Sequence, residues 1–322
     1  MKAIRITEYG GPEVLRYVDT PTPEPGPGEV RVRNGASGVN FLETRQRAGT
    51  YPLPIPGGIG GEGAGVIDAL GAGVTDLKVG ERVAYISSTP GAHAEAMVIP
   101  AYSAVRLPDS VSFERAAASI MKGMTTHMLL KGAYKVKPGD AILVWAAAGG
   151  MGQHIVQWAK HLGARVIAVV GSEEKAPIPK ALGADHVLVS SRDDVVASVK
   201  KLTGEGVVAV YDAIGKDTAM ISLDCLAPLG IFVNYGAASG QPAPLVVTDL
   251  SDRGSLFYTR AVLYTYIRTP ELYRAVSGDF VDALEKKILD LPAPTLYPLA
   301  EAARAHRDIA SRATTGSLVL VP

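Results

Sequence analysis

Three glycines between an apolar strand and a helix carry the clearest chemical signal in this sequence. An apolar strand is expected at 141–146, and it is followed by Ala148, Gly149, Gly150, Met151 and Gly152. Residues 153–162 then repeat apolar side chains at helical spacing. Small residues let the backbone turn sharply and approach a diphosphate, whose charge the amides and dipole of the next helix favour. The pattern predicts a dinucleotide-binding turn, with a purely structural glycine turn as the alternative.

The residues after the second strand indicate which dinucleotide binds. In NAD-binding proteins an acidic residue usually ends this strand and holds the ribose 2′-hydroxyl. Here the strand at 165–170 is followed by Gly171 and Ser172, and Lys175 and Arg192 lie further along. A cation suits a 2′-phosphate, which a carboxylate would repel. The sequence therefore predicts that the cofactor is NADPH.

The elements that position this turn form two domains. Up to about residue 107 the chain reads as short strands broken by glycine and proline, at 2–7, 29–34, 65–70, 82–86 and 93–99. Such spacing favours a barrel or rolled antiparallel sheet. After a helix at 113–131, apolar strands alternate with helices, which indicates an α/β, doubly wound parallel sheet. A helix at 299–309 and a strand at 317–321 are too short to form a core alone, so we expect them to return to the first domain.

Composition narrows the function classes. The 322 residues carry 32 basic and 32 acidic side chains, so no net charge favours nucleic acid or anionic lipid. A single cysteine, Cys225, excludes an internal disulfide and a cysteine-built zinc site. We find no signal-like start and no run of about 20 apolar residues. These observations predict a cytoplasmic protein.

Several segments resemble one family along nearly the whole chain. They are EYGGPEVL, GVNFLETRQRAGTYPLP at 38–54, AAASIMKGMTTHMLL at 116–130, AAAGGMG at 146–152, LGADHV at 182–187 and SRATTGSLVL at 311–320. The chain resembles the medium-chain dehydrogenase/reductase superfamily, and within it the NADPH-dependent quinone oxidoreductases of the zeta-crystallin type. The resemblance implies a discontinuous GroES-like, mainly-β catalytic domain at 1–122 and 266–322, with a Rossmann domain at 123–265. It also implies a homodimer, which we expect to form through the sheet edge near 229–235 and 254–258.

Zinc-containing members of this superfamily have ligands at two positions that differ here. A cysteine follows their Gly-Val pair, where this chain has Asn40, and they have Gly-His-Glu where this chain has Gly60-Gly61-Glu62. The six histidines show no paired spacing that could supply the three ligands of a catalytic zinc. We predict no metal, and we expect Glu62 to be a structural carboxylate bonded to backbone amides.

Without a Lewis acid, the expected acceptor is one that is already activated. Hydride addition to a quinone, or to a conjugated enone, gives a delocalised anion. Asn40 can hydrogen-bond the carboxamide or the acceptor oxygen, and Tyr51 offers a ring and a phenol donor. A turn-capping asparagine and a packing tyrosine are the structural alternatives.

The resemblance implies further cofactor residues: Thr125, Tyr235, Gly236, Arg260 and Arg312. A helix-face hydroxyl and a surface ion pair are the alternatives for Thr125 and Arg312. Ser191 replaces a tyrosine that many relatives carry. Pro177 and Pro179 predict a helix that starts later than in relatives, because proline is tolerated only in a first turn.

Two acidic residues complicate the choice of NADPH. Glu173 and Glu174 directly precede Lys175, and we expect them to face solvent at a helix start, where acids are favoured.

Three functions stay open at this point. The leading one is NADPH-dependent quinone reduction. The second is reduction of the double bond of an enone or alkenal with the same cofactor. The third, from another class, is a cofactor-gated crystallin or RNA-binding protein, which the balanced charge disfavours.

Overall fold

Two compact units divide the chain in this computed structural model, which describes residues 1–290, 292–311 and 314–322. Unit 1 comprises Met1–Met124, Ile267–Glu285 and Pro292–Pro322, and unit 2 comprises Thr125–Tyr266 and Lys286–Leu291. The sequence predicted that the whole chain after 265 belongs to the first domain. Lys286–Leu291 instead groups with unit 2, where the Asp290 amide donates to Gln157 Oε1 at 2.8 Å.

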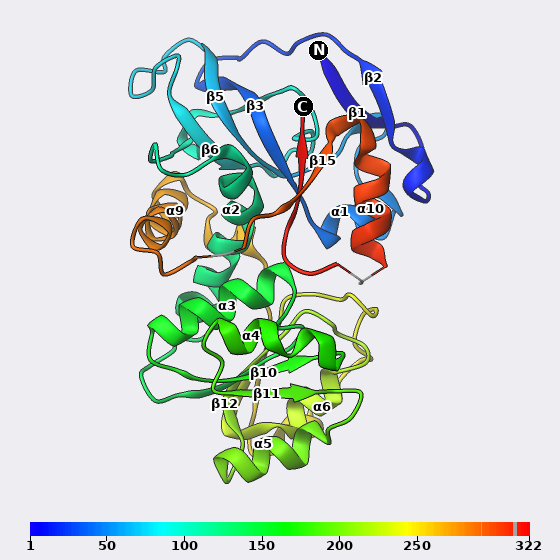
Figure 1. The fold of residues 1–322 in the computed structure, drawn as a ribbon, viewed down its shortest axis with the longest axis vertical. Coiled ribbons are helices and arrows are strands. Elements are labelled where there is room, and N and C mark those ends of the chain that lie inside the picture. Colours follow the sequence, from blue (N-terminus) through cyan, green and yellow to red (C-terminus); the bar gives the residue numbers. More distant parts are fainter. Residues whose placement is uncertain (291, 312–313) are drawn as a thin grey trace. The chain divides into compact units, whose positions relative to one another are not determined.

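Unit 1 is built mainly from antiparallel strands (Figure 1). Among the described residues, one sheet has the order β15-β16-β3-β5-β6-β8, with β7 also paired to β3, and another has the order β2-β1-β4. The strands are β1 (Lys2–Ile6), β2 (Arg16–Asp19), β3 (Glu29–Val39), β4 (Gly57–Gly58), β5 (Glu62–Leu70), β6 (Arg82–Ile86), β7 (Ala96–Pro100), β8 (Val105–Arg106), β15 (Thr295–Pro298) and β16 (Leu318–Val321). The helices are η1 (Pro12–Val14), α1 (Phe41–Arg47), η2 (Ala101–Ser103), α2 (Phe113–His127, which continues into unit 2), α9 (Pro270–Glu285), η5 (Leu299–Glu301) and α10 (Ala302–Ala310).

The core of unit 1 follows from alternation along its strands. In β3, Val30 and Val32 are fully buried, whereas the intervening Arg31 is partly exposed, as a period of two residues requires. At the end of β3, Val39 pairs with Leu318 of β16, so the last strand of the chain lies beside one of the first. This pairing confirms the predicted return of the C-terminal segment to the strand-rich part.

A polar cluster lies inside this apolar core. His93 and His306 are fully buried, and their rings meet edge to face with centroids 5.8 Å apart. Ser37 Oγ lies 3.2 Å from Nδ1 of His93, and Arg47 Nη1 lies 3.3 Å from Nδ1 of His306. Neither Nε2 atom has a hydrogen-bond partner among the described residues.

Unit 2 is a doubly wound parallel sheet of order β11-β10-β9-β12-β13-β14. In Figure 1, α3 and α4 lie on one side of it, and α5 and α6 lie on the other. The strands are β9 (Ala141–Val144), β10 (Arg165–Val170), β11 (His186–Val189), β12 (Val207–Asp212), β13 (Leu226–Asn234) and β14 (Phe257–Arg260). The helices are η3 (a π-helix, Met128–Ala133), α3 (Gly150–His161), η4 (Glu173–Lys175), α4 (Pro177–Ala181), α5 (Val195–Thr203), α6 (Ala219–Asp224), α7 (Thr248–Ser251) and α8 (Leu263–Tyr266). The two units together confirm the predicted fold class.

The two prolines lie in the first turn of α4, where proline is tolerated. Pro177 is the first residue of α4, where its missing amide costs no helical hydrogen bond, and the preceding residues form the separate turn η4. Among the described residues, no helix is both long and apolar enough to cross a membrane.

Candidate cofactor site and active site

The glycine turn places three backbone amides ahead of the hydrogen-bond ladder of α3. The first amide of the α3 ladder is that of Gln153, which donates to Gly149 O at 3.0 Å, so the amides of Gly150, Met151 and Gly152 precede the ladder. A Cβ on Gly152 would lie 2.4 Å from Ala146 O, so only glycine fits there. This turn fits a diphosphate held by amides and by the helix dipole.

Neighbouring residues hold the turn in place. Gln153 Nε2 donates to the carbonyl of Ala148 at 2.8 Å, and the Gly149 amide donates to Ala146 O at 2.9 Å. Ala146 itself has a left-handed backbone, with φ of 53°. The predicted cofactor residue Ala148 is therefore part of a turn that hydrogen bonds from Gln153 and to Ala146 hold in shape.

The residues predicted to bind the 2′-phosphate follow β10 and β11, which are adjacent parallel strands. Gly171 and Ser172 follow β10, Lys175 ends η4, and Arg192 lies in the turn after β11. A Cβ on Gly171 would meet no atom within 4 Å, so the space around it is open. Because the carboxyl ends of parallel strands share one edge of a sheet, these residues and the glycine turn lie at the same edge.

Arg192 is paired with acids of its own unit. Its Nε and Nη2 donate to the two carboxylate oxygens of Asp193 at 2.7 and 2.9 Å, and its Nη1 contacts Glu173. The bonds from Arg192 lower the pKa of Asp193 to about 2. The solvent exposure expected for Glu173 is present, but its pairing with Arg192 was not predicted.

A second group of predicted residues lies at the same edge, after β13 and β14. Arg260 Nη1 donates to Asn234 Oδ1 at 2.7 Å and to Gly236 O at 2.8 Å. Asn234 Nδ2 in turn donates to Gly236 O at 3.0 Å. The hydroxyl of Tyr235 is buried without a hydrogen-bond partner among the described residues. Asn234 thus links Gly236 and Arg260, a role that was not predicted.

Asp212 organises the neighbouring loops and was also missed. This buried carboxylate ends β12 and accepts hydrogen bonds from the amides of Ile214 and Gly215 and from the hydroxyls of Thr218 and Ser222, at 2.6 to 3.1 Å. Burial raises the pKa of Asp212, while these four donors oppose that shift. The available signal was an acidic residue that ends an apolar strand, at the carboxyl edge where ligands of such sheets bind.

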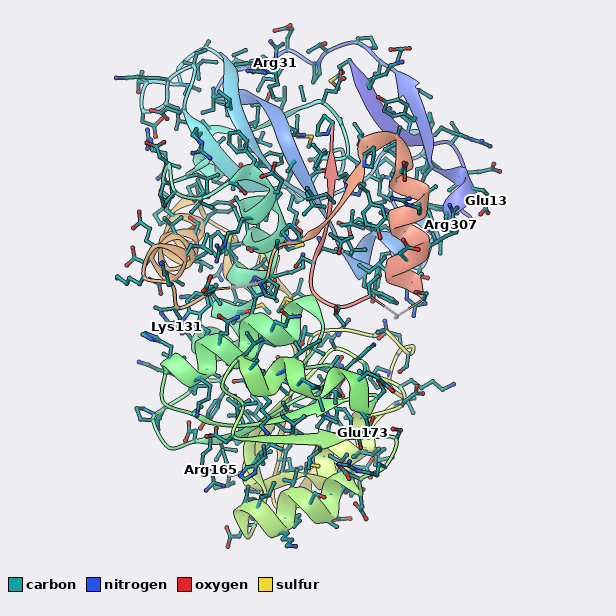
Figure 2. All side chains as sticks on the ribbon, in the orientation of Figure 1. Glu13, Arg31, Lys131, Arg165, Glu173 and Arg307 are labelled. Atoms are coloured by element: carbon teal, nitrogen blue, oxygen red, sulfur yellow. The ribbon has the colours of Figure 1, made fainter. Side chains whose placement is uncertain are left out.

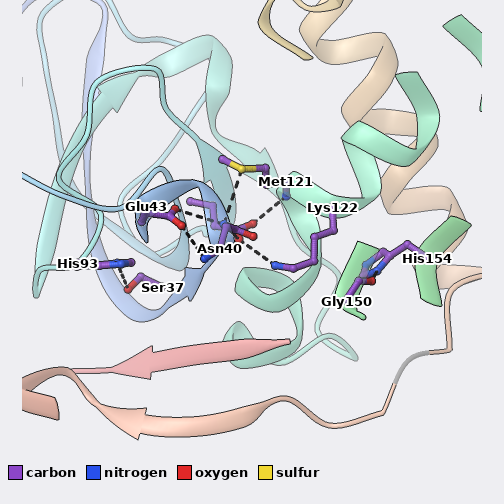
Figure 3. A network of polar contacts seen from close by, with 9 residues as sticks. Ser37, Asn40, Glu43, His93, Met121, Lys122, Gly150 and His154 are labelled. Atoms are coloured by element: carbon purple, nitrogen blue, oxygen red, sulfur yellow. Dashed lines mark hydrogen bonds and ion pairs between the residues drawn. The ribbon is translucent and has the colours of Figure 1, made fainter. Parts of the chain in front are cut away.

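In unit 1, Asn40 lies at the junction of β3 and α1 (Figure 3). Its backbone amide donates to Glu43 Oε2 at 2.6 Å, as in a capping box. Its side-chain Nδ2 donates to Glu62 Oε1 at 2.7 Å and lies 3.4 Å from Glu43 Oε1. The Glu62 carboxylate, which also pairs with Lys122, thus fixes which end of the amide faces it, because a carboxylate oxygen without a proton can only accept.

The carboxylates beside Asn40 are deeply buried. Glu62 is fully buried, accepts from the Met121 amide at 2.9 Å and pairs with Lys122 Nζ at 3.3 Å. Burial raises the pKa of Glu43 to about 7, and the charge of Glu62 acts in the same direction. Glu62 is therefore a buried structural carboxylate with a backbone partner, whereas the buried Glu43 and Lys122 were not predicted.

Three predicted site residues remain, namely Tyr51, Thr125 and Arg312. Tyr51 is half-buried in the loop after α1, and its amide donates to Arg45 O at 3.3 Å. Thr125 lies half-buried in α2. Arg312 falls outside the described residues.

The residues present do not fit a zinc site. Asn40 and Gly61 stand at the two positions where zinc-containing relatives have ligands; an asparagine amide is not a usual zinc ligand, and glycine has no side chain. No group of three or more metal-binding side chains occurs in the described part of the chain.

Known proteins share both the sequence features and the fold of this chain. Two family models match: an alcohol dehydrogenase GroES-like domain over residues 26–109, and a zinc-binding dehydrogenase over residues 150–276. A quinone oxidoreductase of Pseudomonas aeruginosa is 46% identical over 100% of this chain and 99% of its own. A 2-haloacrylate reductase of Burkholderia sp. is 43% identical over 98% of each chain. The crystal structure of Escherichia coli quinone oxidoreductase complexed with NADPH superposes with a TM-score of 0.96, at 40% identity over 100% of both chains.

Proposed function

The chain belongs to the quinone oxidoreductase family, and on that premise we propose that it reduces a quinone with NADPH. The observation that carries the proposal is its full-length likeness to a quinone oxidoreductase solved with NADPH. Unit 2 adds a matching set of groups along one edge of its sheet. When bound, NADPH supplies the hydride that the acceptor receives.

Several groups of unit 2 suit the parts of NADPH. The amides of Gly150, Met151 and Gly152 suit the diphosphate. Lys175 and Arg192, with Ser172, suit the 2′-phosphate, because cations and a hydroxyl donor favour that charge. Thr125, Tyr235, Gly236, Arg260 and Arg312 complete the proposed cofactor residues.

The orientation of the Asn40 side-chain amide determines which of its atoms a ligand can meet. Nδ2 faces Glu62 and Glu43, and Oδ1 faces the Glu43 amide in the capping box, so a ligand can reach only the second lone pair of the acceptor Oδ1. Oδ1 can accept from a carboxamide NH₂ or from a hydroxyl, but it cannot stabilise a developing negative oxygen. We assign the hydrogen bond to that oxygen to the phenol of Tyr51.

The test is NADPH oxidation with 1,4-benzoquinone and with 9,10-phenanthrenequinone. We expect turnover of at least one of them, and its absence on both would reject the proposal. Tyr51→Phe should lower kcat more than it raises KM, because a bond to a developing charge acts mainly in the transition state.

The similarity to a 2-haloacrylate reductase favours a second candidate function, reduction of an activated carbon–carbon double bond. An electron-withdrawing group makes such a bond a hydride acceptor without a metal. Rates with 2-chloroacrylate and with 1-octen-3-one, measured beside the quinones, decide between the two. Faster turnover of either alkene would make it the preferred substrate class.

We also propose a homodimer that forms through the free edge of the unit 2 sheet. The edge strand β14 presents Phe257, which is 59% exposed, and nearby exposed apolar residues are Leu229 (68%) and Val247 (82%). Apolar groups at the outer edge of a sheet favour association with a second copy. Light scattering should give twice the chain mass for the wild type and less for Phe257→Glu. A cytoplasmic location and the absence of nucleic-acid and membrane partners stay predictions from the sequence.

A further inference from the structure

Two of the three residues proposed to bind the 2′-phosphate, Arg192 and Ser172, already contact acidic side chains. Arg192 contacts Glu173, which is labelled in Figure 2, and Asp193. Ser172 donates to Glu174, a bond that lowers the pKa of that carboxyl together with its own backbone amide. A phosphate that enters here therefore meets carboxylates beside each of these groups.

The two acids on Arg192 differ in how firmly they are held. Asp193 forms both a two-oxygen pair with Arg192 and a bond from the Val189 amide at 2.8 Å, and its side chain is 19% exposed. Asp193 thus orients the guanidinium from within its own turn. Glu173 reaches Arg192 from η4, on the loop after the adjacent strand, and its side chain is 58% exposed.

Glu173 can consequently leave Arg192 without breaking the turn. Its carboxylate contacts Nη1, whereas Asp193 occupies Nε and Nη2. An incoming phosphate competes with Glu173 for Nη1, and it is repelled while that carboxylate stays close. NADH carries no 2′-phosphate and faces neither cost.

We propose that Glu173 determines cofactor specificity in this chain by competing with the 2′-phosphate for Arg192. The competition limits the preference for NADPH over NADH. This inference rests on the proposed role of Arg192, so the experiment must test the two separately.

The experiment is a calorimetric titration of NADPH and of NADH against the wild type, Glu173→Gln, Arg192→Ala and the double variant. Glu173→Gln should tighten NADPH about two- to fivefold and change NADH by a clearly smaller factor, the scale expected when one exposed ion pair is removed. The gain should disappear in the Arg192→Ala background, because the two side chains act on one another. It should also shrink as salt is raised.

Glu205→Gln is the matched control. It removes the same charge from unit 2, but it lies before β12, at the amino edge of the sheet. It should leave both affinities unchanged. If Glu173→Gln leaves NADPH affinity unchanged, weakens it, or shifts both cofactors equally while Arg192→Ala weakens NADPH, the competition is refuted and the phosphate site stands. If Arg192→Ala affects NADPH no more than NADH, the assignment of Arg192 itself is wrong, and the competition falls with it.

Discussion

Acid should destabilise unit 1 through two histidines that are buried without charge. Burial lowers the pKa of His93 to about 3. Burial, followed by the proximity of His93 and Arg47, lowers the pKa of His306 well below its usual value of 6.5. Protonation would place a charge beside Nε2 atoms that have no partner in the described core.

The sign and size of the effect follow from proton linkage. Above pH 6.5 both histidines are neutral in the folded and the unfolded chain, so they contribute no pH dependence. Below it the unfolded chain binds protons that the folded core rejects, so the free energy of unfolding falls as the pH falls. For His93 the slope approaches about 1.36 kcal/mol per pH unit, which amounts to about 2.7 kcal/mol at pH 4.5. His306 acts in the same direction.

Glu43 acts in the opposite direction. Its pKa of about 7 in the folded protein lies above its ordinary 4.5, so the folded state holds a proton that the unfolded state releases between these values. Stability from Glu43 therefore rises as the pH falls from 7 to 4.5, by about 3 kcal/mol. The pH dependence of the wild-type free energy of unfolding is the sum of these opposing effects. Only a comparison of wild type with a histidine variant isolates the contribution of one histidine.

The assay compares wild type with His93→Asn by hydrogen exchange of unit 1 amides at pH 7.5 and 4.5, corrected for intrinsic rates. The loss of opening free energy between the two pH values should be smaller in the variant by about 2.7 kcal/mol. His161→Asn, at an exposed position in unit 2, is the control and should match the wild type. An equal loss in wild type and His93→Asn would refute the reasoning.

Three further predictions concern the two sites. Asn40→Asp should lower kcat/KM with NADPH and a quinone about tenfold more than Asn40→Ala, because a new carboxylate would face Glu62; equal or better activity of the aspartate variant would contradict the assigned amide orientation. Lys122→Met should cost about 3–5 kcal/mol in urea unfolding, because it removes the ammonium paired with the buried Glu62, and adding Glu62→Gln should recover part of the loss. Gly152→Ala should weaken NADPH and NADH by similar factors in titrations, since its Cβ would clash with Ala146 O at 2.4 Å; a selective loss of NADPH would not fit a site for the shared diphosphate.

Local patterns made unit 2 predictable. The apolar strand, the glycine turn and the amphipathic helix occupy consecutive residues, and parallel topology then places Ser172, Lys175 and Arg192 at one edge. A helical spacing was also present in α9, at Tyr273, Val276 and Phe280 after Pro270, but it was overlooked.

The long-range polar contacts around Asn40 could not be predicted from local sequence patterns. The contact of Asn40 with Glu43 is a local capping box that was overlooked. Glu62 and Lys122 belong to β5 and α2, and only tertiary packing brings Glu62 to the Asn40 amide and Lys122 to Glu62. Likewise, the sequence shows that Glu173 and Arg192 lie near adjacent strand ends, but not that their side chains pair. Long-range polar contacts carry no periodic signal, since each depends on a single pair of positions.

The pairing of β16 with β3 affects the order in which parts of the protein can fold during its synthesis. Ribosomes complete the contiguous part of unit 2 between the synthesis of these two strands, so its parallel sheet can form first. Until Leu318 emerges, the β3 edge that ends at Val39 lacks this neighbour, and an unpaired edge is a site for wrong association. Asn40 directly follows that edge. The strand pairing of the backbone just before Asn40 is therefore completed only after β16 has been translated.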